Sequence, residues 1–293
     1  MRAFLFPGQG SQKVGMAAGL ARDRLREADD ALGFQLSKII DEGPEAELTR
    51  TANTQPAILT VSIAIADSLR ARGVEAQVAA GHSLGEYSAL VYAGVLGFAD
   101  AVRLVHLRGK FMQEAVPEGV GAMAAIVGLD ASTVRDTCRE ASPDATDACQ
   151  PANLNGGGQV VIAGHKAAVE RAMALAKQKG AKLVKALPVS APFHSALMAP
   201  AAEKLRAEFE RVKLNMFKIP VVSNVTAEPN SDHARVKELL YAQVTGSVRW
   251  EESVQAMAKL GVDEAYEVGP GKVLAGLVKR IAPSIALKEV AGG

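Results

Sequence analysis

The sequence predicts an α/β fold in which a large domain, built on a mostly parallel sheet, carries a smaller inserted domain. In the first and last parts of the chain, short apolar runs typical of buried strands alternate with helical stretches, as in sheets covered by helices on both faces. Between these parts the pattern changes to strands and helices in the order βαββαβ. A chain of 293 residues, of which 48% are hydrophobic, is long enough for both cores.

The first part of the chain begins with a predicted strand, Ala3–Phe6, a short apolar run that ends at a Pro-Gly pair. Gln55-Pro56 predicts the start of a helix, because proline is favoured in a first helical turn. A buried strand, Gln77–Ala80, leads through a tight turn into helices expected over 84–93 and about 98–116.

The middle of the chain, residues 121–189, is predicted to be the inserted domain. The order βαββαβ is typical of a ferredoxin-like unit. Its strands are expected at 122–127, 148–155, 159–163 and 183–189, and its helices at 131–141 and 166–179. Residues 1–120 and 190–293 then form the larger domain.

The last part of the chain returns to alternating helices and strands. Helices are expected over 197–212 and about 252–260, and strands over 219–224 and 264–268. The turn Gly269-Pro270-Gly271 leads into a closing helix. The strands of the first and last parts are therefore expected to form one mostly parallel sheet.

Composition and charge give no indication of a nucleic-acid or membrane partner. A net charge of +1 gives no support to general binding of nucleic acid. The longest apolar stretch, Ala57–Ala66, is interrupted by Thr60 and Ser62 and is too short to span a bilayer. The N-terminal apolar run is too short for a signal peptide, so we expect a cytoplasmic protein without a membrane partner. The only cysteines, Cys138 and Cys149, are expected to be reduced thiols and form no metal-ligand cluster.

The segment Gly81-His82-Ser83-Leu84-Gly85 has the form G-x-S-x-G and lies where a predicted strand turns into a helix. In this context the serine sits on a sharp turn with its hydroxyl exposed. The helix N-terminus behind it offers N–H groups to a developing oxyanion. Ser83 is therefore the candidate nucleophile. The alternative is that the five-residue pattern occurs by chance.

A serine hydroxyl needs a base that accepts its proton, and five histidines are available. His194 ends the short loop Ser190-Ala191-Pro192-Phe193-His194, which follows a predicted strand at the edge where α/β sheets place their sites. It is the best candidate base, and the alternative is a histidine that caps a helix. His82 adjoins Ser83, but its side chain is expected to point away from the serine.

Arg108 falls in the middle of the apolar stripe of the helix predicted over 98–116. Arginine rarely lies on a buried face without an anionic partner. An internal salt bridge or a snorkelling side chain is the simpler explanation. The alternative is a guanidinium that binds a substrate carboxylate through two parallel hydrogen bonds.

Acyl transfer also requires backbone donors to the oxyanion. One donor is the N–H of the residue after the nucleophile, Leu84, and the second comes from another strand-to-helix loop. Gln9, which is flanked by glycines after the first predicted strand, is suited to this role, although a plain tight turn is the alternative. No aspartate or glutamate is marked by its surroundings as a third member of a triad.

Six segments together resemble the malonyl-CoA:acyl carrier protein transacylases of fatty acid synthesis. They follow the order of that family and span essentially the whole chain. The segments are FPGQGSQ at 6–12, GHSLGEYSAL at 81–90, RLVHLRGKFMQEAVPEG at 103–119, GQVVIAGHK at 158–166, APFHSALM at 191–198 and YEVGPGKVL at 266–274. The resemblance implies a hydrolase-like α/β domain, 1–120 and 190–293, that carries a ferredoxin-like insertion, 121–189.

The resemblance also implies a role for each matching residue. Ser83 corresponds to the acyl-accepting nucleophile and His194 to its base. Gln9 and Leu84 correspond to the backbone oxyanion donors. Gln243 corresponds to the residue whose backbone carbonyl orients the histidine, which would explain why no acid is evident.

Two further matches concern the acyl group. Arg108 corresponds to the arginine that holds the malonyl carboxylate. Phe193 precedes the histidine, and in related acyltransferase domains phenylalanine there accompanies malonyl whereas serine accompanies methylmalonyl. The reason is steric, because a bulky ring leaves no space for a branch at C2. Some carrier-protein transacylases of the family nevertheless carry serine at this position.

The implied reaction transfers malonyl from malonyl-CoA to the phosphopantetheine thiol of acyl carrier protein through a malonyl-serine intermediate, and so supplies fatty acid chain elongation. The expected partners are malonyl-CoA and acyl carrier protein, and no metal or other cofactor is expected. Two alternatives stay open: a serine thioesterase or esterase, and a non-catalytic subunit that binds a carrier protein. The motifs do not distinguish a fatty acid enzyme from a polyketide one.

Overall fold

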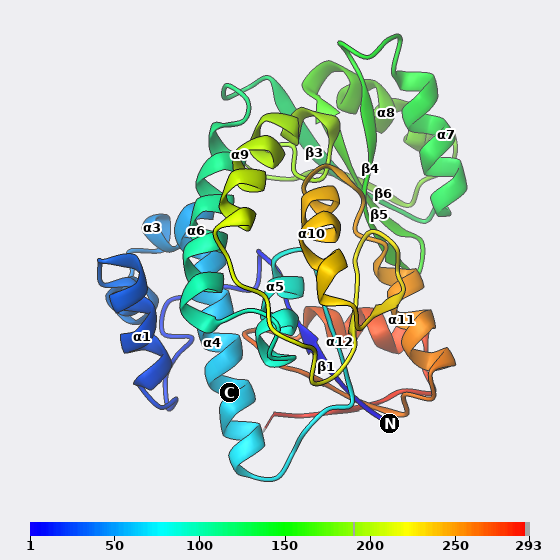
Figure 1. Ribbon diagram of the computed structural model, residues 1–293. Helices are drawn as coiled ribbons and strands as arrows, with labels where there is room; N and C mark the ends of the chain where they lie inside the picture. The colour runs from blue at the N-terminus through cyan, green and yellow to red at the C-terminus, as the bar shows by residue number, and fades with distance from the viewer. Residues whose placement is uncertain (190, 291–293) are drawn as a thin grey trace.

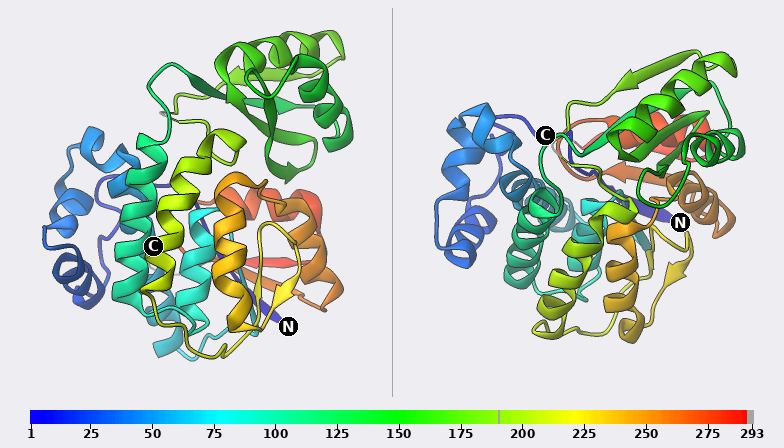
Figure 2. Two further views of the ribbon diagram at one scale, coloured as in Figure 1. Left: turned by 45° about the horizontal axis from the view of Figure 1, so that its top comes forward. Right: turned by 90° about the horizontal axis from the view of Figure 1, so that it is seen from above.

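Two β-sheets organise the structure, a computed structural model that describes residues 1–189 and 191–290 (Figure 1). The larger sheet has six strands and the smaller sheet four. The smaller sheet and its helices stand to one side of the larger part of the molecule (Figure 2). Ser190, the first residue of the loop predicted before His194, lies outside the described residues.

The larger sheet has the strand order β10-β9-β1-β2-β7-β8. Neighbouring strands are parallel, except that β8 is antiparallel to β7. The predicted α/β fold with a mostly parallel sheet is therefore confirmed. The strands are β1 (Arg2–Phe6), β2 (Val78–Gly81), β7 (Val221–Val222), β8 (Pro229–Asn230), β9 (Glu264–Glu267) and β10 (Ala286–Lys288).

The central strands β1 and β2 are buried on both faces, which is typical of parallel strands between helices. Phe4, Phe6 and Ala79 point to the main core on one face, and Leu5 and Val78 point to a second core on the other. The main core is built with α1 (Asp23–Leu32), α2 (Leu36–Glu42), α3 (Glu45–Thr49), α4 (Thr51–Ala71), α5 (Leu84–Tyr92), α6 (Phe98–Glu114), α9 (Ala199–Glu210) and α10 (Val236–Thr245), and the second core with α11 (Trp250–Lys259) and α12 (Val273–Ile281).

The smaller sheet has the strand order β4-β5-β3-β6, and each neighbouring pair is antiparallel. Two helices, α7 and α8, pack in the apolar core on one face of this sheet. The elements are β3 (Gly121–Val127), α7 (Ala131–Ala141), β4 (Cys149–Gly156), β5 (Gln159–His165), α8 (Lys166–Gln178) and β6 (Leu183–Ala186).

Strand β4 connects the smaller sheet to the larger part of the molecule. The N–H of Leu154 donates to the carbonyl of Val248 at 2.8 Å, and the N–H of Val248 donates to the carbonyl of Ala152 at 2.8 Å. Phe193 packs against an apolar cluster on this sheet as well as against the main core. The loop that carries His194 therefore lies where the two sheets meet.

Several elements are shorter than the sequence predicts. The strand expected over 183–189 ends at Ala186, and the strand expected over 219–224 contains only Val221 and Val222. Pro188 and Pro220 lie in the missing parts and have no N–H to donate to a strand ladder. The helix expected over 197–212 begins as a 3₁₀ turn, Ala196–Met198. Helix α10, the short strands β8 and β10, and the 3₁₀ turn His233–Arg235 were not predicted.

Helix α4 begins at Thr51 rather than at Gln55-Pro56, so Pro56 lies inside the helix. Proline lacks the N–H that would bond to the carbonyl of Ala52, one turn earlier. That carbonyl instead accepts a hydrogen bond from Nδ1 of His106, at 2.8 Å. The contact also explains why His106 is half-buried.

Helices α4 and α6 cross closely at Gly109, and this crossing gives a first prediction. A Cβ at Gly109 would lie 2.5 Å from the carbonyl oxygen of Thr51, whereas a Cβ at Gly276 in α12 would meet no atom within 4 Å. We expect Gly109→Ala to lower the free energy of unfolding by about 1–3 kcal/mol through overpacking. We expect the control, Gly276→Ala, to raise it by about 0.5–1 kcal/mol because alanine favours the helix. Urea unfolding monitored by circular dichroism measures both, and equal effects of the two variants would contradict the prediction.

Candidate active site

Ser83 lies on a sharp turn between β2 and α5, with φ 53° and ψ −107°. This backbone conformation is strained for a residue other than glycine. The turn is also crowded, since a Cβ at Gly81 would lie 1.9 Å from the carbonyl of Gly85, and a Cβ at Gly85 would lie 2.0 Å from the carbonyl of Phe6. The two glycines of the motif therefore allow the elbow to pack directly against β1.

The structure brings Ser83 and His194 together, although 111 residues separate them in the sequence. Ser83 Oγ lies 2.7 Å from His194 Nε2. On the other side of the ring, Nδ1 lies 2.9 Å from the carbonyl of Gln243 and 3.2 Å from that of Gly246. Carbonyls only accept hydrogen bonds, so Nδ1 carries the proton and Nε2 offers its lone pair to the serine O–H. Two carbonyls thus occupy the place that a carboxylate takes in a triad.

The environment of His194 keeps its ring neutral. Burial, and then the positive charge of Arg108, lower the pKa of His194 to about 3. The side chain is only 3% exposed. Near neutral pH the imidazole is therefore unprotonated at Nε2 and able to accept a proton.

Arg108 is a buried cation next to the nucleophile, with 1% of its surface exposed. Its Nη1 donates to Oε1 of Gln55 at 2.9 Å, and its Nη2 donates to Oε1 of Gln243 at 2.9 Å and to Ser83 Oγ at 3.1 Å. The ring of Tyr87 lies 5.4 Å from the guanidinium carbon. Within the described part of the chain no carboxylate lies in salt-bridge range of Arg108, so neither an internal salt bridge nor snorkelling accounts for its position.

Neutral amide oxygens leave the charge of Arg108 without a counterion. Burial accordingly lowers the pKa of Arg108 from its ordinary value. Its Nε has no hydrogen-bond partner among the described residues. A guanidinium held in this state binds a small carboxylate favourably, because the ligand supplies the charge and the acceptors that the protein does not.

Gln243, in α10, contacts the base, the arginine and the turn of the nucleophile. Its main-chain carbonyl accepts from His194, and its side-chain Oε1 accepts from Arg108. Its Nε2 donates to the carbonyl of Ser83 at 2.9 Å and to Oε2 of Glu86 at 2.7 Å. The family resemblance implied a role for the main-chain carbonyl only, whereas the fully buried side chain also forms hydrogen bonds within the site.

Asn224, Glu86 and Gln55 belong to the site and were missed by the sequence analysis. Asn224 Oδ1 accepts from the N–H of Ser83 at 2.7 Å, and its Nδ2 donates to the carbonyl of Gly81 at 2.6 Å. Two signals were available in the sequence: Asn224 follows a predicted strand at its carboxyl end, and Glu86 is the one carboxylate in the otherwise uncharged helix α5.

The loop with Gln9 lies against the elbow, because Gly8 approaches the carbonyl of His82 so closely that a Cβ would lie 2.5 Å from it. Gln9 is exposed, and its side chain contacts Oγ1 of Thr51 at 3.3 Å. Leu84 is the first residue of α5, where helical N–H groups have no partner within the helix. Leu84 therefore adjoins Ser83 in the chain, and the loop that carries Gln9 lies against the turn that carries Ser83.

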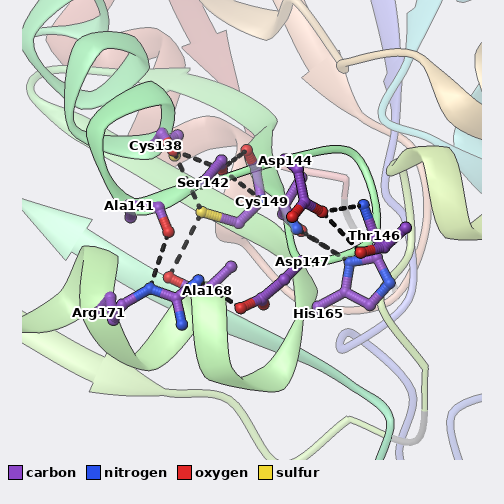
Figure 3. Close-up of polar contacts among 11 residues, drawn as sticks. Cys138, Ala141, Ser142, Asp144, Thr146, Asp147, Cys149, His165, Ala168 and Arg171 are labelled. Atoms are coloured by element: carbon purple, nitrogen blue, oxygen red, sulfur yellow. Dashed lines mark hydrogen bonds and ion pairs between the residues drawn. The ribbon is translucent and has the colours of Figure 1, made fainter.

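The remaining candidates lie outside this arrangement. His82 points away from Ser83, and its Nε2 lies 2.9 Å from Oδ1 of Asn155 in β4. Cys138 and Cys149 are free and buried between α7 and the smaller sheet, with Cys149 Sγ 3.6 Å from the carbonyl of Ala168 (Figure 3). The residues that the structure describes contain no group of three or more side chains suited to hold a metal ion.

Known proteins that resemble this chain share an acyl transferase domain. Residues 3–290 match the acyl transferase domain family. The chain belongs to the acyl transferase family. Among curated proteins, this acyl transferase is similar to the malonyl CoA-acyl carrier protein transacylase of Escherichia coli (strain K12), with 51% identity over 290 residues that cover 97% of this chain and 93% of the relative.

Solved structures of acyl transferases give the same result. An acyl carrier protein S-malonyltransferase from Vibrio cholerae superimposes with a TM-score of 0.95 and 46% identity, covering 98% of this chain and 96% of that one. A malonyl-transacylase in complex with its type II PKS acyl-carrier protein superimposes with a TM-score of 0.96 and 45% identity, covering 100% and 96%. Within residues 1–189 and 191–290, no helix of this acyl transferase has the length and apolar character needed to cross a membrane.

The environment of His194 gives a second prediction. Because burial and Arg108 both lower the pKa of His194, the ring should titrate well below the ordinary value of about 6.5. Arg108→Met should shift the titration of His194 upward, because it removes the positive charge that, after burial, lowers this pKa most. Histidine-observed NMR between pH 3 and pH 8 shows whether either ring titrates in this range, and a His194 that titrates between 6 and 7 in the unaltered protein would contradict the prediction.

Proposed function

We propose that this protein transfers malonyl from malonyl-CoA to the phosphopantetheine thiol of acyl carrier protein, through an ester on Ser83, and supplies fatty acid chain elongation. The observation that carries this proposal is the buried guanidinium of Arg108, 3.1 Å from the nucleophile hydroxyl and without a carboxylate of the described residues in salt-bridge range. The names of the relatives and the complex of one relative with its acyl-carrier protein agree with it.

In the first half of the reaction, Ser83 Oγ attacks the thioester carbonyl carbon while His194 Nε2 accepts the hydroxyl proton. The N–H groups of Gln9 and Leu84 stabilise the tetrahedral oxyanion. When the intermediate collapses, the carbon–sulfur bond breaks and His194 returns its proton to the sulfur of CoA. The malonyl group remains as an ester on Ser83.

The second half repeats these steps in reverse with a different thiol. The phosphopantetheine thiol gives its proton to His194 and attacks the ester carbonyl. The bond to Ser83 Oγ then breaks, and the serine takes the proton from His194. The carbonyls of Gln243 and Gly246 hold Nδ1–H throughout, so the same tautomer serves both halves.

Arg108 provides selectivity for an acyl group that ends in a carboxylate. Its two terminal nitrogens match the two oxygens of the malonyl carboxylate. An uncharged acyl group would leave the buried cation unpaired, which is costly and therefore disfavours such groups. Phe193 lies next to His194 where the two sheets meet, and its ring limits the space for a branch at C2. A hydrolase has no need of a cation at this place, which argues against the esterase alternative.

We also propose that residues 121–189 are an inserted ferredoxin-like domain and that 1–120 and 190–293 form a hydrolase-like domain. The strand order β4-β5-β3-β6 and the placement of α7 and α8 on one face support the first part. The proposed reaction uses only side chains and backbone groups of this chain, and needs no metal or other cofactor. We propose a cytoplasmic location, where malonyl-CoA and carrier proteins meet.

A third prediction tests the covalent intermediate. Brief incubation with malonyl-CoA should add one malonyl group to Ser83, and carrier protein bearing phosphopantetheine should remove it, whereas Ser83→Ala should gain no adduct. Intact-protein mass spectrometry with peptide mapping measures this. Free malonate in place of an adduct would indicate a hydrolase. Neither product would indicate a non-catalytic subunit.

A fourth prediction tests the role of Arg108. In Arg108→Ala the rate of malonyl loading should fall on the order of 100-fold or more, because a buried charge-assisted contact is lost. Loading from acetyl-CoA should fall much less or rise. The control is Arg103→Ala on the exposed side of the same helix, where the arginine pairs with Asp100. Equal losses for malonyl and acetyl would refute the proposed role.

A further inference from the structure

Glu86 is a buried carboxylate that the proposed mechanism does not use. It is the third residue of α5, three positions after Ser83, and 3% of its surface is exposed. A carboxylate in such a place is costly unless hydrogen-bond donors surround it. The cost suggests that Glu86 has a function.

Two donors, both from segments distant in the sequence, reach Glu86. Its Oε2 accepts from Nε2 of Gln243 at 2.7 Å and from the N–H of Asn224 at 3.2 Å. A cavity of about 10 Å³ beside Glu86, lined also by Ser223 and Asn230, has space for no more than about one water molecule. Gln243 and Asn224 donate these two hydrogen bonds, and the Ser223 side chain also lies beside the carboxylate.

The hydrogen bonds of Gln243 show how Glu86 affects the orientation of the Gln243 amide. An amide side chain has one end that only donates and one end that only accepts. The donating end of Gln243 faces two acceptors, Glu86 Oε2 and the carbonyl of Ser83, so the accepting end must face Arg108 Nη2. A flipped amide would place its N–H groups against the guanidinium and an oxygen against the carboxylate. Above a pH of about 7, where Glu86 is mostly ionised, the carboxylate only accepts and makes that flip unfavourable.

Glu86 also contacts the segment that supports the nucleophile. Asn224, whose N–H is bound to Glu86, holds the N–H of Ser83 and the carbonyl of Gly81 with its side chain. The carboxylate thus connects the support of Arg108 with the support of the elbow. Arg108 and Glu86 have no direct salt bridge, so any effect of Glu86 on malonyl passes through Gln243.

We propose that Glu86 is a positioning residue for malonyl recognition: its carboxylate fixes the orientation of the Gln243 amide, which in turn holds Arg108 in place for the substrate carboxylate. This inference rests on the proposed function. It assigns selectivity for the acyl group to a residue that touches neither the substrate nor Arg108.

The test compares malonyl-CoA and acetyl-CoA as donors for loading of Ser83 in Glu86→Gln and Gln243→Met, both of which keep the backbone carbonyl that orients His194. In each variant we expect the KM for malonyl-CoA to rise by roughly 10- to 100-fold, the range seen when a residue that orients a binding group is removed, and to rise by a clearly larger factor than the KM for acetyl-CoA. Glu42→Gln is the matched control, because Glu42 is an exposed residue at the end of α2. The double variant Glu86→Gln/Gln243→Met should be no less selective than Gln243→Met alone, because the two act in series.

The unfolding temperature of Glu86→Gln provides a second readout. If Glu86 only stabilised the fold, the substitution would lower this temperature, whereas a positioning residue held at a cost to stability predicts no decrease at pH 8. Burial raises the pKa of Glu86 to about 7, from an ordinary value near 4.5. The folded protein then favours the protonated form, so the stability contributed by Glu86 is present below pH 4.5 and is lost as pH rises through 7. At pH 8 Glu86→Gln should unfold at an equal or higher temperature than the unaltered protein, and this advantage should vanish toward pH 4.5. Arg108, the charged group nearby, acts against the rise in pKa without cancelling it.

Three results would overturn the inference: unchanged selectivity in Glu86→Gln, unchanged selectivity in Gln243→Met, or equal losses for both donors together with a lower unfolding temperature at pH 8. If Glu86→Gln does not fold, the selectivity of Gln243→Met alone decides. Failure of the unaltered protein to load malonyl on Ser83 would instead refute the proposed function, so the two failures are distinguishable.

Discussion

The close packing of the elbow against β1 is the constraint on which the rest of the site depends. Ser83 projects from a strained turn, and the strain persists only because the surrounding backbone is held from several sides. At Gly81 and Gly85 the neighbouring backbone leaves no space for a Cβ. This contact places the serine at the carboxyl edge of the parallel sheet, directly beside the loop after β1 that carries Gln9.

Around this turn the protein has assembled a buried network of polar side chains rather than a triad with an acid. Hydrogen bonds of 2.6–3.2 Å connect Arg108, Gln243, Glu86 and Asn224 to one another and to the elbow. Polar groups in a low-dielectric site interact strongly, and an unsatisfied member is costly. The network therefore has a defined arrangement, with a cation left available for a carboxylate and an imidazole kept neutral by burial.

The smaller sheet forms one side of the active site. Strand β4 of the smaller sheet contacts the residues on either side of the chemistry: Asn155 binds His82, and Gln150 Nε2 binds the carbonyls of His194 at 3.3 Å and Thr245 at 3.2 Å. A change in the placement of the smaller sheet would thus be transmitted to both the nucleophile and the base. Phe193, packed against the main core and against the apolar cluster on the smaller sheet, occupies the same junction.

The sequence by itself determined the parts of the site that local patterns encode. Each of three local patterns can be recognised from a short stretch of chain: the strand-turn-helix pattern around Ser83, the loop position of His194, and the charged residue in an apolar stripe at Arg108. The mostly parallel sheet likewise followed from alternating strands and helices. Strand ends were less well predicted, because proline and edge position shorten a strand only once its neighbours are known.

Only the tertiary structure decided which partners these residues have. Gln243 reaches Ser83 across 160 positions, Asn224 reaches it across 141, and Gln55 reaches Arg108 across 53. No periodicity or motif specifies such pairs, because the partner of a buried polar group is whichever group packing brings within hydrogen-bond distance. For the same reason the sequence left open whether Arg108 was paired with an acid, and the folded chain answered it with two neutral amides.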